Sequence, residues 1–278
     1  MDRWKQCMKF FFMNHLGTYR MLAVGVISAI CMDIYARPIR KLCEVYDLTL
    51  SLWGMPIFWN RRHVPVLFLL IFLFAIAHFP LNRRVHQYFV SRLGVRIWIL
   101  FQSIYLLIYS GLYIIWCYAL FVITLCPRGS FSPDYYQGWW KLSKLAEQDE
   151  TGVLIRIPQE YLLSHGSRQA NLEFMLCLWL VLFFICMIVL LFNQIRSYLG
   201  DIIACFVILS GLSNKITGGR MWFSPMHFLS LSNRYSALHP ENPQYLYMIL
   251  ILVVLSAILY ILAESWICST QENNRRVN

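Results

Sequence analysis

Long apolar runs, separated by stretches that hold most of the charges, constrain this chain more than any other feature. Two of these runs, residues 172–192 and 245–267, reach the roughly 17–25 residues that a helix needs to cross the hydrocarbon of a bilayer. Hydrophobic residues make up 59% of the 278 residues and charged residues 14%, whereas soluble domains hold about 45–50% and about 25%. The sequence therefore predicts an all-α, polytopic membrane protein with one transmembrane domain over residues 1–278.

Six of the apolar runs are predicted to span the membrane. The third run is long enough to tilt or to project beyond the bilayer. The fifth is the weakest, and we count it because Leu199–Gly200 allows the chain to turn back after the fourth. Four or five spans are the alternative. The predicted spans are residues 21–36, 64–79, 97–125, 172–192, 201–216 and 245–267.

The charges around the spans predict an orientation. With the N-terminus inside, the cytoplasmic pieces hold eleven Lys and Arg in 57 residues, and the outer pieces hold thirteen in 106. Eight acidic residues lie outside against three inside. By the positive-inside rule this favours a cell-membrane protein with both termini in the cytoplasm. Basic residues that flank membrane spans also explain the net charge of +10. We therefore expect membrane lipids as partners of these residues, and no nucleic acid.

Residues 1–20 precede the first span and alternate basic residues with Trp, Met and Phe. This pattern predicts an amphipathic helix that lies in the membrane interface. An ordinary basic flank before the first span is the alternative.

The residue patterns of intramembrane catalysis are missing from the sequence. No H-E-x-x-H, G-x-S-x-G or Walker A motif is present. The nine cysteines form no C-x-x-C pair and the seven histidines are scattered, so we expect no metal site and no disulfide framework. Asp33, Glu173 and Glu264 come close to membrane depth, but each lies near a span end and is interpreted as a border residue rather than a proton relay. We therefore expect no catalytic residue, metal or cofactor in this chain.

Two stretches at the outer ends of the spans carry Phe-Ser-Pro followed by aromatic residues. They are GSFSPDYYQGWWKL (129–142) and RMWFSPMHFLSL (220–231). Ser before Pro is a plausible helix start, and the aromatic residues suit the level of the lipid headgroups. Each stretch is predicted to form a short helix at the outer leaflet or, alternatively, an aromatic-anchored loop.

The link between the second and third predicted spans, NRRVHQYFVSRLGVR (82–96), is short and basic. Val85, Phe89 and Leu93 are spaced by four, so a short helix would have an apolar face, and Gly94 can end it. One interpretation is a hairpin whose arginines contact lipid phosphates. The other is a coupling helix, which docks on a soluble partner and transmits its movement to the spans.

This layout resembles the type-2 ABC exporter permease family, in particular the small stand-alone permeases of Gram-positive bacterial type whose ATPase is a separate chain. The resemblance depends on VSRLGVRIWILFQSIYLLIYS (90–110) and MWFSPMHFLSL (221–231). The first is similar to the family's F-L-x-x-R-x-G-[KR]-x-x-W/Y stretch, and the second to its S-P motif before the last span. The segment NRRVHQY departs from the family, because it lacks the acidic residues that such permeases often have there.

The resemblance implies a permease subunit that exports an amphipathic or hydrophobic cargo, such as a peptide or a lipid-like molecule. A second copy or a sister permease would complete the pathway, and ATP and Mg²⁺ would bind in separate cytoplasmic ATPase subunits. The implied contacts with the ATPase are Arg83, Arg84, Val85, Tyr88, Phe89, Arg92, Leu93 and Arg96. The implied outer gate is formed by Trp222, Phe223, Ser224, Pro225 and Phe228. The implied pathway residues, on the second and fifth spans, are Phe72, Phe74, Phe206 and Ile208.

Two other functions compete with the permease. The chain could be a membrane-embedded assembly, regulatory or binding protein that docks a cytoplasmic partner through the link without moving cargo. An intramembrane enzyme is disfavoured by the missing catalytic motifs.

Overall fold

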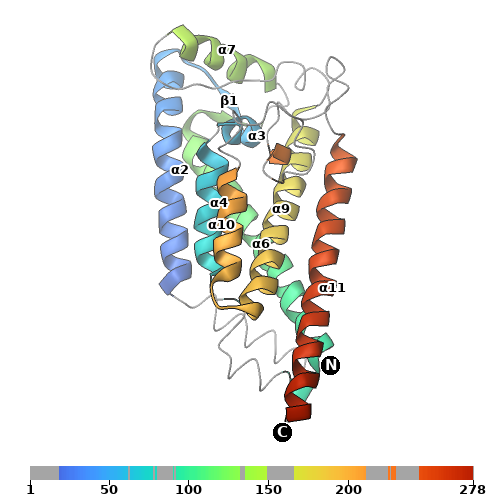
Figure 1. The fold of residues 1–278 in the computed structure, drawn as a ribbon. Coiled ribbons are helices and arrows are strands. Elements are labelled where there is room, and N and C mark those ends of the chain that lie inside the picture. The colour runs from blue at the N-terminus through green and yellow to red at the C-terminus, as the bar shows by residue number, and fades with distance from the viewer. Residues whose placement is uncertain are drawn as a thin grey trace.

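The computed structural model describes residues 19–61, 63–77, 79, 90, 92–131, 135–148, 166–210, 225, 227–229 and 244–277. Over these residues the chain is mostly helical, as predicted, and the long helices form an elongated bundle (Figure 1). The bundle helices are α2 (Tyr19–Val45), α4 (His63–Ile76), α6 (Val95–Leu125), α9 (Ser167–Ile195), α10 (Leu199–Ser210) and α11 (Tyr245–Val277). The smaller elements are β1 (Leu50–Ser51), α3 (Met55–Trp59), η1 (Cys126–Arg128), β2 (Gly129–Ser130), α7 (Tyr135–Gln148) and η2 (His227–Leu229).

Four of the helices, α2, α6, α9 and α11, are long and apolar enough to cross a membrane. α2 also exposes an apolar stripe with the spacing of one helix face, formed by Leu22, Val26, Ile30 and Ile34. Such a stripe is unfavourable in water and suits the hydrocarbon of a bilayer. Together these features indicate a membrane protein.

The helices over the second and fifth predicted spans are shorter. α4 has 14 residues and α10 has 12, which at about 1.5 Å per residue gives lengths of about 21 Å and 18 Å. The hydrocarbon core of a typical bilayer is about 30 Å thick. Residues 211–216, the remainder of the fifth predicted span, lie outside the described residues. The count of six spans therefore stays a prediction.

The bundle helices alternate in direction, so the bundle has two distinct ends (Figure 1). β1 follows α2, β2 follows α6, and the two strands pair in parallel, so both helices end at what we call the α7 end. At the opposite end, Asn193 of α9 bonds the carbonyl of Phe79, just past α4. There too, Arg96 near the start of α6 pairs with Glu264 of α11. We call this the link end, because the link connects α4 and α6 there.

α9 forms the centre of the bundle, and it packs against α4, α6, α10 and α11. All residues from Phe184 to Leu191 are buried. This part of the helix has no polar face, and a helix that is hydrophobic all round is expected in the interior of a bundle.

The α7 end is closed by a small platform made of β1, β2, α3 and α7, and α7 lies across the end of the bundle (Figure 1). The indole of Trp139 on α7 donates a hydrogen bond to the carbonyl of Ser51 at 2.9 Å. The strands pair Leu50 with Gly129 and Ser51 with Ser130. This pair was not expected of an all-α chain. It arises because two connecting segments meet at the same end and satisfy each other's backbone groups.

Candidate functional site

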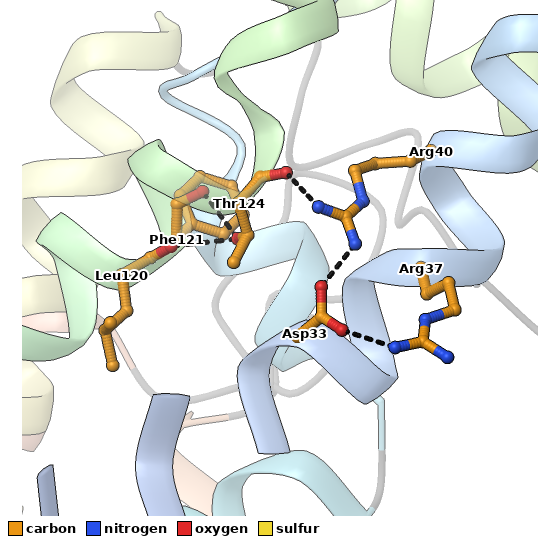
Figure 2. Close-up of polar contacts among 6 residues, drawn as sticks. All are labelled: Asp33, Arg37, Arg40, Leu120, Phe121 and Thr124. Atoms are coloured by element: carbon orange, nitrogen blue, oxygen red, sulfur yellow. Dashed lines mark hydrogen bonds and ion pairs between the residues drawn. The ribbon is translucent and has the colours of Figure 1, made fainter. Parts of the chain in front are cut away.

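A charged cluster joins α2 to the end of α6 (Figure 2). Asp33, Arg37 and Arg40 lie at positions i, i+4 and i+7 of α2, which places them on one face of the helix. Arg37 Nη2 donates to one carboxylate oxygen of Asp33 at 2.8 Å, and Arg40 Nη2 donates to the other. The cluster therefore holds one negative and two positive charges.

Arg40 also anchors the cluster to α6, since its Nη1 donates to the carbonyl of Thr124 at 3.3 Å. Thr124 lies in the last turn of α6, where backbone carbonyls lack partners within the helix and the helix dipole favours a cation. The hydroxyl of Thr124 bonds back to the carbonyls of Leu120 and Phe121, at 2.9 and 3.0 Å. Asp33 is thus paired with two arginines, and its interpretation as a border residue stays a prediction.

A third arginine, Arg61, lies between α3 and α4 and contacts α2. Its Nη1 donates to the carbonyl of Tyr35 at 3.2 Å, and its guanidinium carbon lies 5.8 Å from the centre of the Phe58 ring. Its Nε and Nη2 atoms are buried and have no hydrogen-bond partner among the described residues. Burial lowers the pKa of Arg61 to about 10, so the side chain is still protonated at neutral pH. Arg61 is thus a charged group that the described residues leave largely uncompensated.

Sequence reasoning did not single out Arg61. It stands in the run NRRH (60–63), which has the composition of an ordinary basic flank beside a span. The guanidinium is buried because α2 packs against α4, with α3 beside them, and this packing cannot be read from the sequence.

Three of the predicted coupling residues are described, and they lie at the link end. Arg92 is exposed, Leu93 is half-buried and packs against the bundle core, and Arg96 pairs with Glu264 at 2.8 Å. Arg83, Arg84, Val85, Tyr88 and Phe89 lie outside the described residues.

The last turn of the link ends at Gly94, as its sequence suggested. The N–H of Gly94 bonds the carbonyl of Val90 at 3.0 Å, and its φ of 82° is favoured by glycine. Whether residues 82–96 form a coupling helix stays a prediction.

The predicted outer gate is described only in part. Trp222, Phe223 and Ser224 lie outside the described residues. Pro225 and Phe228 are buried, and the thiol of Cys177 on α9 lies 3.7 Å from the carbonyl oxygen of Phe228. This part of the segment therefore packs against the central helix, and its role as a gate stays a prediction.

The four predicted pathway residues lie on α4 and α10, which pack against each other. Phe72 and Ile208 are buried, and the ring of Phe72 lies 5.0 Å from that of Tyr113. Phe74 is 48% exposed and Phe206 is 70% exposed. The structure thus places two of these residues in the interior and two on the surface.

No group of three or more His, Cys, Asp and Glu side chains that could hold a metal ion is found among the described residues. Comparisons of the chain with protein-family models, with curated proteins and with solved structures find no match. The resemblance to ABC exporter permeases therefore stays a prediction that depends on the two sequence stretches 90–110 and 221–231.

Proposed function

We propose that this chain is the transmembrane permease subunit of an ABC exporter in the cell membrane, driven by a separate cytoplasmic ATPase. One observation carries the proposal. α4 and α10, the helices over the two spans that the resemblance assigns to the pathway, lie side by side and are shorter than the other four bundle helices. Each exposes a phenylalanine, Phe74 and Phe206 respectively. A pathway between two subunits requires apolar surface of this kind, which a second subunit would cover.

The chemistry of α4 and α10 suggests the class of cargo. Apart from His63 and Asp201 near their first residues, both helices consist of uncharged residues, mostly Phe, Leu, Ile and Val. A lining of this kind has no fixed charge to replace the hydration shell of an inorganic ion. It suits an amphipathic or hydrophobic cargo, such as a peptide or a lipid-like molecule.

The link end is where the ATPase would bind. The positive-inside bias assigns this end, with both termini, to the cytoplasm. There the Arg96–Glu264 ion pair connects the last residue of the link, in the first turn of α6, to α11. A movement of the link would therefore reach both helices.

Purification of the tagged full chain in detergent, with identification of the copurifying chains, tests the proposal. We expect an ATPase subunit, and we expect Phe89→Asp to remove it and to abolish transport. Leu93 is left unchanged, because it packs against the bundle core. As a matched control, Arg83→Ala with Arg84→Ala should weaken association less and in a salt-dependent way, since exposed charge pairs contribute only about 0–1 kcal/mol each.

Two results would contradict the proposal. One is a purified chain with no ATPase. The other is a Phe89→Asp variant that keeps its ATPase in full amount and still transports. If the variant instead loses a partner that is not an ATPase, the assembly or regulatory function is favoured.

A further inference from the structure

Arg61 has hydrogen-bond donors that the fold leaves unused. Its Nη1 donates to the carbonyl of Tyr35, which holds the guanidinium in place, whereas Nε and Nη2 find no partner in the part of the chain that the structure describes. The N–H groups of Nε and Nη2 point the same way from the planar guanidinium. They form the fork that binds a carboxylate or phosphate through two parallel hydrogen bonds. The two unused donors therefore have the geometry that binds two oxygens of one anion.

The surroundings of Arg61 favour an anion. Asp33 and Asp47, two acids near this end of the bundle, already pair with other arginines. α4 begins at His63, two residues after Arg61, and the positive end of its dipole adds to the field of the guanidinium. Burying a charge without a counter-charge is strongly unfavourable, so a ligand that supplies one is stabilised there.

We propose that the Arg61 fork binds a phosphate-type anion between α2, α3 and α4 at the α7 end. The anion comes either from the headgroup of a lipid in the adjacent leaflet or from free phosphate. Arg61 as a whole is half-buried, but its Nε and Nη2 atoms are buried, so binding requires the side chains that cover the fork to move aside. The proposal is independent of the permease function.

Thermal unfolding of the purified full chain in a neutral detergent tests the proposal. Phosphatidylglycerol is added in one arm, inorganic phosphate in a second, and chloride at equal ionic strength in a third. We expect phosphatidylglycerol, phosphate or both to raise the melting temperature of the wild type relative to chloride. An effect of the lipid alone identifies a headgroup as the source, and an effect of phosphate alone identifies a free anion.

Arg61→Met is the decisive variant, and Lys41→Met is its matched control. Lys41 is an exposed cation of α2, so its loss removes the same charge from the surface. We expect Lys41→Met to respond to the anion like the wild type and Arg61→Met to show no response. Without anion, Arg61→Met should melt at or above the temperature of the wild type, because an uncompensated charge has been removed.

Arg61→Lys keeps the charge but loses the fork, and should bind the anion at least about tenfold more weakly. It also serves as the test variant if Arg61→Met does not fold. The proposal is overturned if the wild type and the Arg61 variants gain the same stability from each anion, or if neither anion stabilises the wild type.

Discussion

Gly138 of α7 lies where no side chain fits. A Cβ atom at this position would lie 2.1 Å from the carbonyl oxygen of Thr49, which precedes β1. Glycine in a helix interior costs about 1 kcal/mol relative to alanine. The close approach to Thr49 explains why α7 nevertheless contains it. At the same place, a Cβ on Gly54 would collide with the ring of Trp139, so the platform is closely packed on both sides.

We predict that Gly138→Ala destabilises the protein by about 1–3 kcal/mol, because the added methyl group forces α7 away from the backbone of the platform. Thermal unfolding in detergent, followed by tryptophan fluorescence, measures the loss. Gly25→Ala is the matched control. Gly25 also lies in a helix, but its Cβ would make only ordinary contact with Trp116 at 3.8 Å, so this change should be neutral or stabilising. Equal stability of the two variants would show that α7 does not pack on β1 as described.

At the residue scale, part of the charged cluster can be predicted from the sequence. The spacing of Asp33, Arg37 and Arg40 alone places them on one helix face. The carbonyl of Thr124 that completes the cluster comes from a helix far along the chain, and no local pattern identifies it. The burial of Arg61 likewise depends on packing between elements.

The turn between α9 and α10 depends on the side chain of Asn193. Its Nδ2 donates to the carbonyl of Phe79 at 2.7 Å and to Asp201 at 3.3 Å, and its Oδ1 accepts the N–H of Gly200 at 2.8 Å. One amide thus connects the end of α4, the end of α9 and the start of α10. A Cβ on Gly200 would lie 2.7 Å from the carbonyl oxygen of Val189, which explains the glycine at the start of α10.

We predict that Asn193→Ala lowers stability by about 2–3 kcal/mol, because it removes several hydrogen bonds of about 1 kcal/mol each and leaves partners unpaired. Gln194→Leu is the control at the next position. The amide nitrogen and oxygen of Gln194 are buried and form no hydrogen bond with the described residues, so this change should be neutral or stabilising. Chemical or thermal unfolding of both variants measures their stability. If the two variants lose similar stability, Asn193 does not have the role described.

At the element scale, the apolar runs predict where the bundle helices lie, because burial and lipid contact both require apolar residues. Helix ends are predicted less well. α2 continues to Val45, past the predicted span end at residue 36, because its arginines pair within the helix and with α6. β1 and β2 have two residues each, too few for any sequence pattern to predict. Most of the link and most of the gate lie outside the described residues, so the coupling helix and the gate stay predictions.

At the scale of the whole molecule, the directions of the long helices require two return passes. α2 and α6 both run toward the α7 end, because the strands that follow them pair in parallel. α9 and α11 both run toward the link end. The chain must therefore return between α2 and α6, and again between α9 and α11, and α4 and α10 lie on these returns. A bilayer can thin locally around short helices at modest cost, so we propose that both cross the membrane.

Labelling of single cysteines in intact cells tests this six-pass arrangement most directly. Cysteines are introduced one at a time at Gln87, Gln148 and Asn214 in a chain without its native cysteines, and a membrane-impermeant thiol reagent is added. We predict modification at Gln148 and Asn214, and protection at Gln87 until the cells are permeabilised. Equal labelling at Gln87 and Gln148, protection at Asn214, or the reverse pattern would contradict six alternating passes with a cytoplasmic link.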